Sequence, residues 1–204
     1  MYNPEIHHRN STRLKGYNYA QNGAYYVTIC VRNRNCLFGE IVSGSIRLSE
    51  YGEIASEEWK RLGNRFQRVT FDVFQIMPNH IHSIICIDNV GATLAVALNV
   101  VGVDNSAAHI MDNPQNRTCA NRAGASPAPT TITTTTVGNI VGAYKSLTYK
   151  RCLDLCKSKN ETLGKLWQRN YYEHIIRNDA EYYRISDYID NNPETWLNDE
   201  FWTK

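Results

Sequence analysis

Residues 77–87 constrain the fold of this chain more than any other stretch. They read MPNHIHSIICI, a Met-Pro-Asn turn followed by two histidines that one isoleucine separates. Side chains in a strand alternate between faces, so His80 and His82 project from one side and Ile81 from the other. The β-branched run that follows is too short for a long helix and is typical of a strand. Two imidazoles on one strand face can bind a single divalent ion.

A second segment, residues 178–193, favours this interpretation over the commoner case of two ordinary histidines. Asn178 or Asp179 suits a helix N-cap, and Pro193 ends the helix or closely follows it. Tyr188 and Asn192 are four residues apart and therefore lie on one face of that helix. A phenol beside a carboxamide oxygen suits a nucleophile and a neutral metal ligand. Packed against the histidine strand, this helix would complete a His-His-Asn site with a tyrosine aimed at it.

The remaining segments predict strands and helices around these two elements. We expect strands over 24–32, 69–76 and 166–177, a hairpin over 37–48, and helices over 49–62 and 137–153. Ser49 is the expected N-cap of the first helix, in which Gly52 is a minor defect. The buried stripe of that helix should contain Tyr51, Ile54, Ala55, Trp59 and Leu62. Antiparallel strands with helices on one face predict an α+β fold.

The 204 residues suit a single domain that spans 1–204 and carries one long insertion. Residues 88–136 are rich in Ala, Asn, Thr, Gly and Pro, and they lack clear periodicity. A structureless stretch of about fifty residues within a compact domain indicates a low-complexity, mobile insertion. We assign it no chemistry.

The net charge of +2 provides no basic tail, so any contact with DNA must come from local clusters. Several basic residues lie near aromatic residues, a combination that suits phosphates and unpaired bases. The alternative is that these cations lie on ordinary solvated faces and that the aromatic residues belong to the core. The candidate DNA-binding residues are Arg13, Lys15, Arg32, Arg34, Lys145, Lys150, Arg169 and Arg177.

The sequence contains no secretory signal and no apolar run long enough to cross a membrane. Its six cysteines lack paired CxxC spacing, so we expect reduced thiols, with a structural zinc site as a weak alternative. We therefore expect a cytoplasmic protein with no membrane partner. The sequence leaves open whether it is a monomer or a homodimer.

The chain contains the blocks MPNHIHSIICI, DYIDNNP, RLKGYNYAQNGAYYVTICVRNRNCLFGEI, GAYKSLTYKR and LWQRNYYEHIIRN. In these blocks it resembles the HUH single-tyrosine transposases, and within them the REP-associated tyrosine transposases. The resemblance covers nearly the whole chain except the insertion. It implies a ferredoxin-like (RRM-like) antiparallel sheet with the histidines on a central strand. It also implies Mg²⁺ or Mn²⁺ chemistry on single-stranded DNA, often next to a hairpin.

Position by position, the resemblance implies that His80 and His82 are metal ligands, that Tyr188 is the nucleophile and that Asn192 is the third protein ligand. The asparagine four residues after Tyr188 favours this phenol over its competitors. Those competitors are Tyr149, Tyr182 and Tyr183.

These residues leave three hypotheses for the function. In the first, Tyr188 attacks a phosphodiester, leaving a 5′-phosphotyrosine and a free 3′-OH, and a second 3′-OH later rejoins the strand. In the second, the protein binds DNA hairpins without cutting them. In the third, it is a metal hydrolase that uses water, for which Tyr188 would be dispensable.

Overall fold

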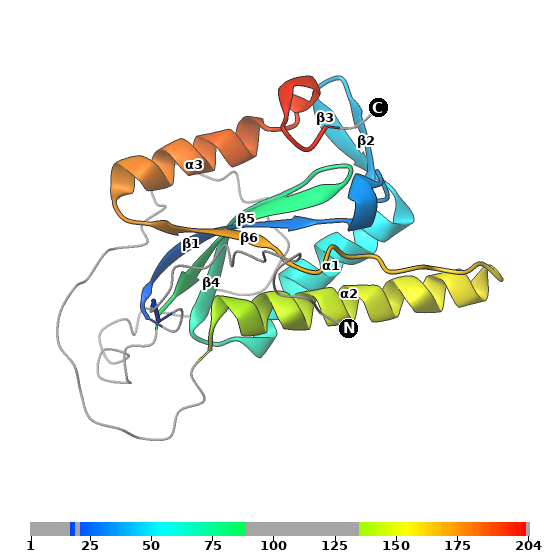
Figure 1. Ribbon diagram of the computed structural model, residues 1–204, viewed down its shortest axis with the longest axis horizontal. Coiled ribbons are helices and arrows are strands. Elements are labelled where there is room, and N and C mark those ends of the chain that lie inside the picture. Colours follow the sequence, from blue (N-terminus) through cyan, green and yellow to red (C-terminus); the bar gives the residue numbers. More distant parts are fainter. Residues whose placement is uncertain (1–16, 19–20, 89–134, 203–204) are drawn as a thin grey trace, which may run out of the picture.

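A four-stranded antiparallel sheet is the centre of the molecule (Figure 1). The computed structural model describes residues 17–18, 21–88 and 135–202. The strand order is β4 (Val69–Ile76), β5 (His80–Ile87), β1 (Gly23–Cys30) and β6 (Tyr172–Ile176). Helix α1 (Glu50–Arg65) precedes β4, and helix α2 (Val137–Ser158) precedes β6. This β-α-β-β-α-β order confirms the predicted α+β, ferredoxin-like fold, with the histidines on a central strand.

The two faces of the sheet are covered differently, because alternate residues of each strand point to opposite sides. One face carries Ile81 and packs against α1 and α2 in the larger hydrophobic core. The other carries Ile84 and packs against helix α3 (Asp179–Asn191) in a smaller core. Helices therefore lie on both faces, and the expectation of helices on one face is wrong. Strand alternation puts His80 and His82 on the same face as Ile84, which is the face that α3 covers.

Smaller elements occupy the end of the sheet where β5 begins. A separate two-stranded hairpin consists of β2 (Gly39–Val42) and β3 (Ser45–Leu48), as predicted. The 3₁₀ helix η1 (Arg32–Arg34) begins after Val31, so β1 ends at Cys30, two residues before the predicted end at 32. The 3₁₀ helix η3 (Trp196–Asn198) follows α3 and leads into the last described residues.

The predicted strand over 166–177 is only partly correct. Residues 172–176 pair with β1, whereas Trp167 forms just an isolated bridge with Val31. The intervening backbone is held from the side, since the Lys145 ammonium donates to the carbonyl oxygens of Gln168 and Asn170 at 3.0 and 2.9 Å. Helix α2 also continues five residues beyond the predicted end at 153, to Ser158.

Helix α1 begins as predicted, because the Ser49 hydroxyl accepts a hydrogen bond from the Gly52 amide at 3.2 Å. Gly52 is buried, and a Cβ atom there would lie 2.1 Å from the carbonyl oxygen of Phe38. The glycine is therefore required by close packing and is not a defect. Of the predicted stripe, Tyr51 and Ile54 are only partly buried, and Glu58 is buried instead.

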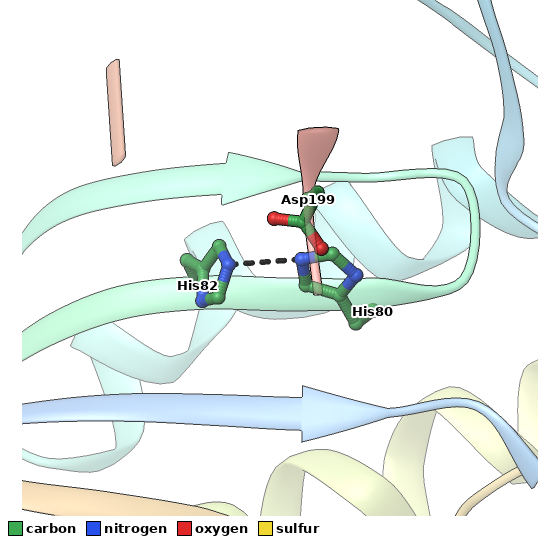
Figure 2. Close-up of side chains that lie close together, drawn as sticks. All are labelled: His80, His82 and Asp199. Atoms are coloured by element: carbon green, nitrogen blue, oxygen red, sulfur yellow. Dashed lines mark hydrogen bonds between the residues drawn. The ribbon is translucent and has the colours of Figure 1, made fainter. Parts of the chain in front are cut away.

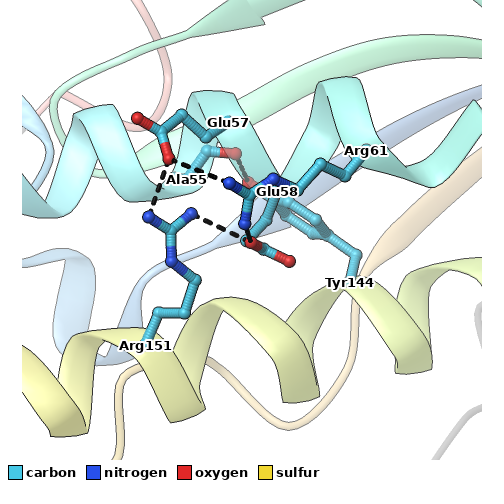
Figure 3. A network of polar contacts seen from close by, with 6 residues as sticks. All are labelled: Ala55, Glu57, Glu58, Arg61, Tyr144 and Arg151. Carbon is cyan, nitrogen blue, oxygen red and sulfur yellow. Dashed lines mark hydrogen bonds and ion pairs between the residues drawn. The ribbon is translucent and has the colours of Figure 1, made fainter.

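The buried carboxylate of Glu58 lies in an ionic network between α1 and α2 (Figure 3). Its Oε1 accepts hydrogen bonds from Arg61 and Arg151, both at 2.9 Å. Beside it, the Tyr144 hydroxyl donates to the Ala55 carbonyl at 3.0 Å. A buried charge needs such partners, and here they connect the two helices on the face opposite α3.

Two expectations fall outside the described residues: the role of Arg13 and Lys15, and the nature of the insertion, of which 89–134 are not described. Among the helices that are described, none is both long enough and apolar enough to cross a membrane.

Candidate metal centre and nucleophile

Strand β5 places His80 and His82 on the same face, as the alternation of strand side chains predicted. Both side chains are fully buried. Their Nε2 atoms lie 2.9 Å apart, and the ring centroids lie 4.4 Å apart. The two nitrogens that most often ligate metals thus converge on one point between the rings.

Asn79 holds the first histidine. Its Oδ1 lies 2.8 Å from Nδ1 of His80, and its Nδ2 donates to the carbonyl oxygens of Arg34 and Phe201. Burial, with a smaller effect from the nearby Arg34 cation, lowers the pKa of His80 to about 3. The imidazole is therefore neutral at physiological pH, which is the form that binds metals.

Two hydroxyls of β1 hold the second histidine. The Tyr26 hydroxyl lies 2.8 Å and the Thr28 hydroxyl 2.9 Å from Nδ1 of His82. Thr28 stands directly opposite His82 in the β1–β5 pairing. Burial, followed by repulsion from His80, lowers the pKa of His82 well below its ordinary value.

Asp199 completes a His-His-Asp cluster, which the sequence did not predict (Figure 2). It follows η3, and one ligand atom from each of the three residues lies within 4.8 Å of the others. Its Oδ1 accepts a hydrogen bond from the Phe201 amide at 2.6 Å. No motif or local spacing distinguishes this aspartate from other acidic residues, so the sequence carried no signal for it.

Asn192 lies next to this cluster at the end of α3. The side chain is 1% exposed, and its Nδ2 donates to Oδ2 of Asp199 at 2.8 Å. Its Oδ1 is buried and has no hydrogen-bond partner among the described residues. A buried oxygen without a partner is costly unless something else satisfies it. Two imidazole nitrogens with carboxylate and carboxamide oxygens are a chemically suitable donor set for a divalent cation.

Tyr188 lies at the exposed side of the cluster, and 42% of its surface is accessible. The ring centroid is 5.5 Å from that of His82, and the hydroxyl donates to Oδ2 of Asp199 at 3.2 Å. Partial burial, followed by the Asp199 charge, raises the pKa of Tyr188 to about 12. The phenol is therefore protonated at neutral pH and hydrogen-bonded within the cluster.

The chain is similar to known proteins in sequence and in fold. No protein-family model matches the chain. An uncharacterized protein of Haemophilus influenzae is 36% identical over 201 residues, which is 98% of this chain and 97% of that protein. The chain belongs to the family of that protein.

A solved structure of a REP-associated tyrosine transposase bound to a REP hairpin shares 16% identity, with a TM-score of 0.52. The match covers 90% of this chain and 74% of the other. The chain has the fold of a REP-associated tyrosine transposase. The resemblance noted in the sequence is therefore confirmed for the fold.

Within this transposase fold, the competing phenols lie away from the histidines. Tyr182 donates a hydrogen bond to Asp72 of β4 and packs in the smaller core. Tyr183 packs against Tyr182 and is 46% exposed. Tyr149 packs against the larger core on the opposite face. Tyr26 of β1, which is not one of the predicted competitors, also contacts His82, but at Nδ1.

Of the predicted DNA contacts, Arg34 lies closest to the site. Its guanidinium carbon is 4.9 Å from the Phe201 ring centroid, and that ring lies 4.7 Å from the ring of His80. Lys145 is already engaged by two backbone carbonyls, and burial lowers its pKa to about 8. The other candidates within the described ranges are exposed, and they are Arg32, Lys150, Arg169 and Arg177.

Proposed function

We propose that this protein is a transposase-type endonuclease and strand transferase that cuts single-stranded DNA near hairpins through a 5′-phosphotyrosine intermediate. The observation that carries the proposal is the position of Tyr188. Its ring lies 5.5 Å from that of His82, and its hydroxyl is bonded to the third member of the His-His-Asp cluster. A nucleophile, an acidic partner and a potential cation site thus lie together on a transposase fold.

His80, His82 and Asp199 would hold a divalent cation, Mg²⁺ or Mn²⁺, with Asn192 Oδ1 as a further ligand. The orphaned oxygen of Asn192 and the convergent Nε2 atoms support this assignment. A bound cation would neutralise charge on the non-bridging oxygens of the scissile phosphate and lower the pKa of the adjacent phenol.

Tyr188 would supply the nucleophile. Its oxygen forms a bond to phosphorus as the bond to the 3′ oxygen breaks. The 3′ oxygen takes up a proton from water, which leaves a 5′-phosphotyrosine and a 3′-OH. Asp199 Oδ2 is the acceptor already bonded to the phenol and would receive its proton. The covalent bond retains the energy of the phosphodiester, so attack by another 3′-OH rejoins a strand without ATP.

The fold and the charges near the site support hairpin DNA as the substrate. The REP-associated transposase of similar fold is bound to a REP hairpin. In this chain, Arg34 beside the cluster suits a phosphate next to the scissile bond, and the exposed Arg32, Arg169 and Arg177 suit more distant phosphates. Arg13, Lys15, Lys150 and Lys145 stay predictions from the sequence.

The test is to incubate the full chain with end-labelled hairpin DNA and Mg²⁺ or Mn²⁺, and to resolve covalent adducts under denaturing conditions. Tyr188→Phe should bind the hairpin but form no adduct. Tyr183→Phe is the matched control, since it removes a similarly exposed hydroxyl from the same helix and should form the adduct normally.

Three results would contradict the proposal in different ways. An undiminished adduct in Tyr188→Phe would exclude this residue as the nucleophile. Hairpin binding with no adduct in the unmodified protein would favour the non-cleaving DNA-binding protein. Cleavage without an adduct, equally fast in Tyr188→Phe, would favour a hydrolase that uses water.

A further inference from the structure

The two histidines of the cluster differ in the groups that contact their Nδ1 atoms. His80 faces the carboxamide oxygen of Asn79, which can only accept a hydrogen bond. His82 faces the hydroxyls of Tyr26 and Thr28, which can either donate or accept. This difference determines where each ring carries its proton.

The tautomer of His80 is fixed by its neighbour. The Asn79 amide nitrogen donates to two backbone carbonyls, at 3.1 Å to Arg34 and 2.8 Å to Phe201. Rotating the amide by half a turn would put its oxygen against both carbonyls, so this orientation is the only satisfied one. Oδ1 therefore faces His80, whose Nδ1 must carry the hydrogen. The Nε2 atom of His80 is then a lone-pair acceptor.

The hydrogen bond between the two rings fixes the proton of His82. The two Nε2 atoms are 2.9 Å apart, a hydrogen-bond distance that requires one proton between them. Because Nε2 of His80 has none, the proton belongs to Nε2 of His82. Its Nδ1 is then an acceptor, and the Tyr26 or Thr28 hydroxyl donates to it.

A cation between the rings requires the opposite arrangement at His82, because both Nε2 atoms must offer lone pairs. We propose that Tyr26 and Thr28 are positioning residues that let His82 exchange tautomers when a cation binds. Water takes the proton from Nε2 and supplies one to Nδ1, so the imidazole stays neutral, and a hydroxyl turns from donor to acceptor. This inference rests on the proposed cation site.

The hydroxyl pair serves this exchange better than a carbonyl or a carboxylate would. A group that can only accept, such as the Asn79 oxygen beside His80, would fix His82 in the tautomer with its proton at Nδ1. The lone pairs of the two Nε2 atoms would then face each other whenever no cation lies between them. With hydroxyls, Nδ1 of His82 is satisfied in both states. The cation then replaces the hydrogen bond between the two Nε2 atoms, and every ring nitrogen of His80 and His82 still has a partner.

Nitrogen-15 NMR of the imidazole rings tests the assignment directly, in the full chain with chelator and again with saturating Mg²⁺ or Zn²⁺. His82 should be protonated at Nε2 with chelator and at Nδ1 with either cation. His80 should be protonated at Nδ1 throughout. His174 is the internal reference, since its Nε2 lies 2.7 Å from the Glu181 carboxylate, outside the cluster. A His82 ring protonated at Nδ1 with chelator present would overturn the proposal.

Calorimetric titration with Zn²⁺ gives a second, independent readout. The Tyr26→Phe/Thr28→Val variant should bind about 10–100-fold more weakly. Thr28→Ser keeps the hydroxyl and should bind as the unmodified protein does. Equal affinity in the double variant would overturn the positioning role.

The outcomes also separate this inference from the proposed cleavage activity. If the unmodified protein binds neither cation, the exchange is overturned together with the metal centre. If tautomer exchange occurs but no DNA adduct forms, the inference holds and only the cleavage function fails.

Discussion

The side-chain nitrogen of Asn79 lies 2.8 Å from the carbonyl oxygen of Phe201, a residue 122 positions further along the chain. The same carboxamide accepts a hydrogen bond from His80, at 2.8 Å. One buried side chain therefore holds both the first histidine and the carboxyl-terminal segment that carries Asp199. The geometry of the cluster depends on this connection.

Replacing Asn79 with alanine should weaken the candidate metal centre and the fold together. The change leaves the Arg34 and Phe201 carbonyls without their donor and releases the ring of His80, at a cost of about 1–3 kcal/mol in unfolding free energy. Zn²⁺ affinity should fall by about 10–100-fold. Denaturant unfolding and calorimetry measure the two effects. Asn170→Ala, at an exposed asparagine, should change neither. Normal affinity in Asn79→Ala would refute its positioning role.

Asp199→Asn should reduce cation affinity by about tenfold or more while leaving the fold intact. The substitution keeps the size of the side chain but removes the one negative charge in the cluster. Asp187→Asn removes a charge from the exposed side of α3 and is the matched control. Calorimetric titration of both variants with Zn²⁺ or Mn²⁺ provides the measurement. If both variants bind equally well, Asp199 is not a ligand.

Gly52→Ala should destabilise the protein, although alanine is the better helix former by about 1 kcal/mol. The new methyl group would lie 2.1 Å from the Phe38 carbonyl oxygen, so backbone must move. Gly63→Ala lies in the same helix, and outside that helix no heavy atom of the described residues lies within 4 Å of the added carbon. It should instead stabilise the protein by up to about 1 kcal/mol. Opposite shifts in the denaturation midpoint are expected. A higher midpoint in both variants would show that the backbone near Phe38 moves away from the new methyl group without loss of stability.

Without a cation, the protein should lose stability as the pH falls below the ordinary histidine pKa of about 6.5. Burial lowers the pKa of His80 to about 3 and that of His82 well below its ordinary value. In this range the unfolded chain binds more protons than the folded one, so acid favours unfolding. The loss is at most about 1.4 kcal/mol per pH unit for each histidine.

Denaturant unfolding with chelator, at several pH values between neutral and mildly acidic, measures this slope. In the His80→Gln/His82→Gln variant, the free energy of unfolding should fall less steeply with decreasing pH than in the unmodified protein. All other titrating groups are common to both proteins. Identical slopes would mean that the two rings do not stay neutral in the folded state.

Several features of this protein were determined by the sequence alone, because their causes are local. Strand alternation placed His80 and His82 on one face, helical spacing aligned Tyr188 with Asn192, and side-chain caps set the starts of α1 and α3. Each of these depends only on residues a few positions apart, so a periodic pattern is enough to predict it.

The tertiary structure alone decided which distant groups join that framework. Asp199 belongs to the cluster only because the chain after α3 returns to the start of β5, where Asn79 binds it. Gly52 is required only because the Phe38 backbone passes close to it. Lys145 forms its two hydrogen bonds only because the 168–170 backbone passes close to its ammonium group. Such contacts depend on the path of the whole chain, and no local pattern of residue types records that path.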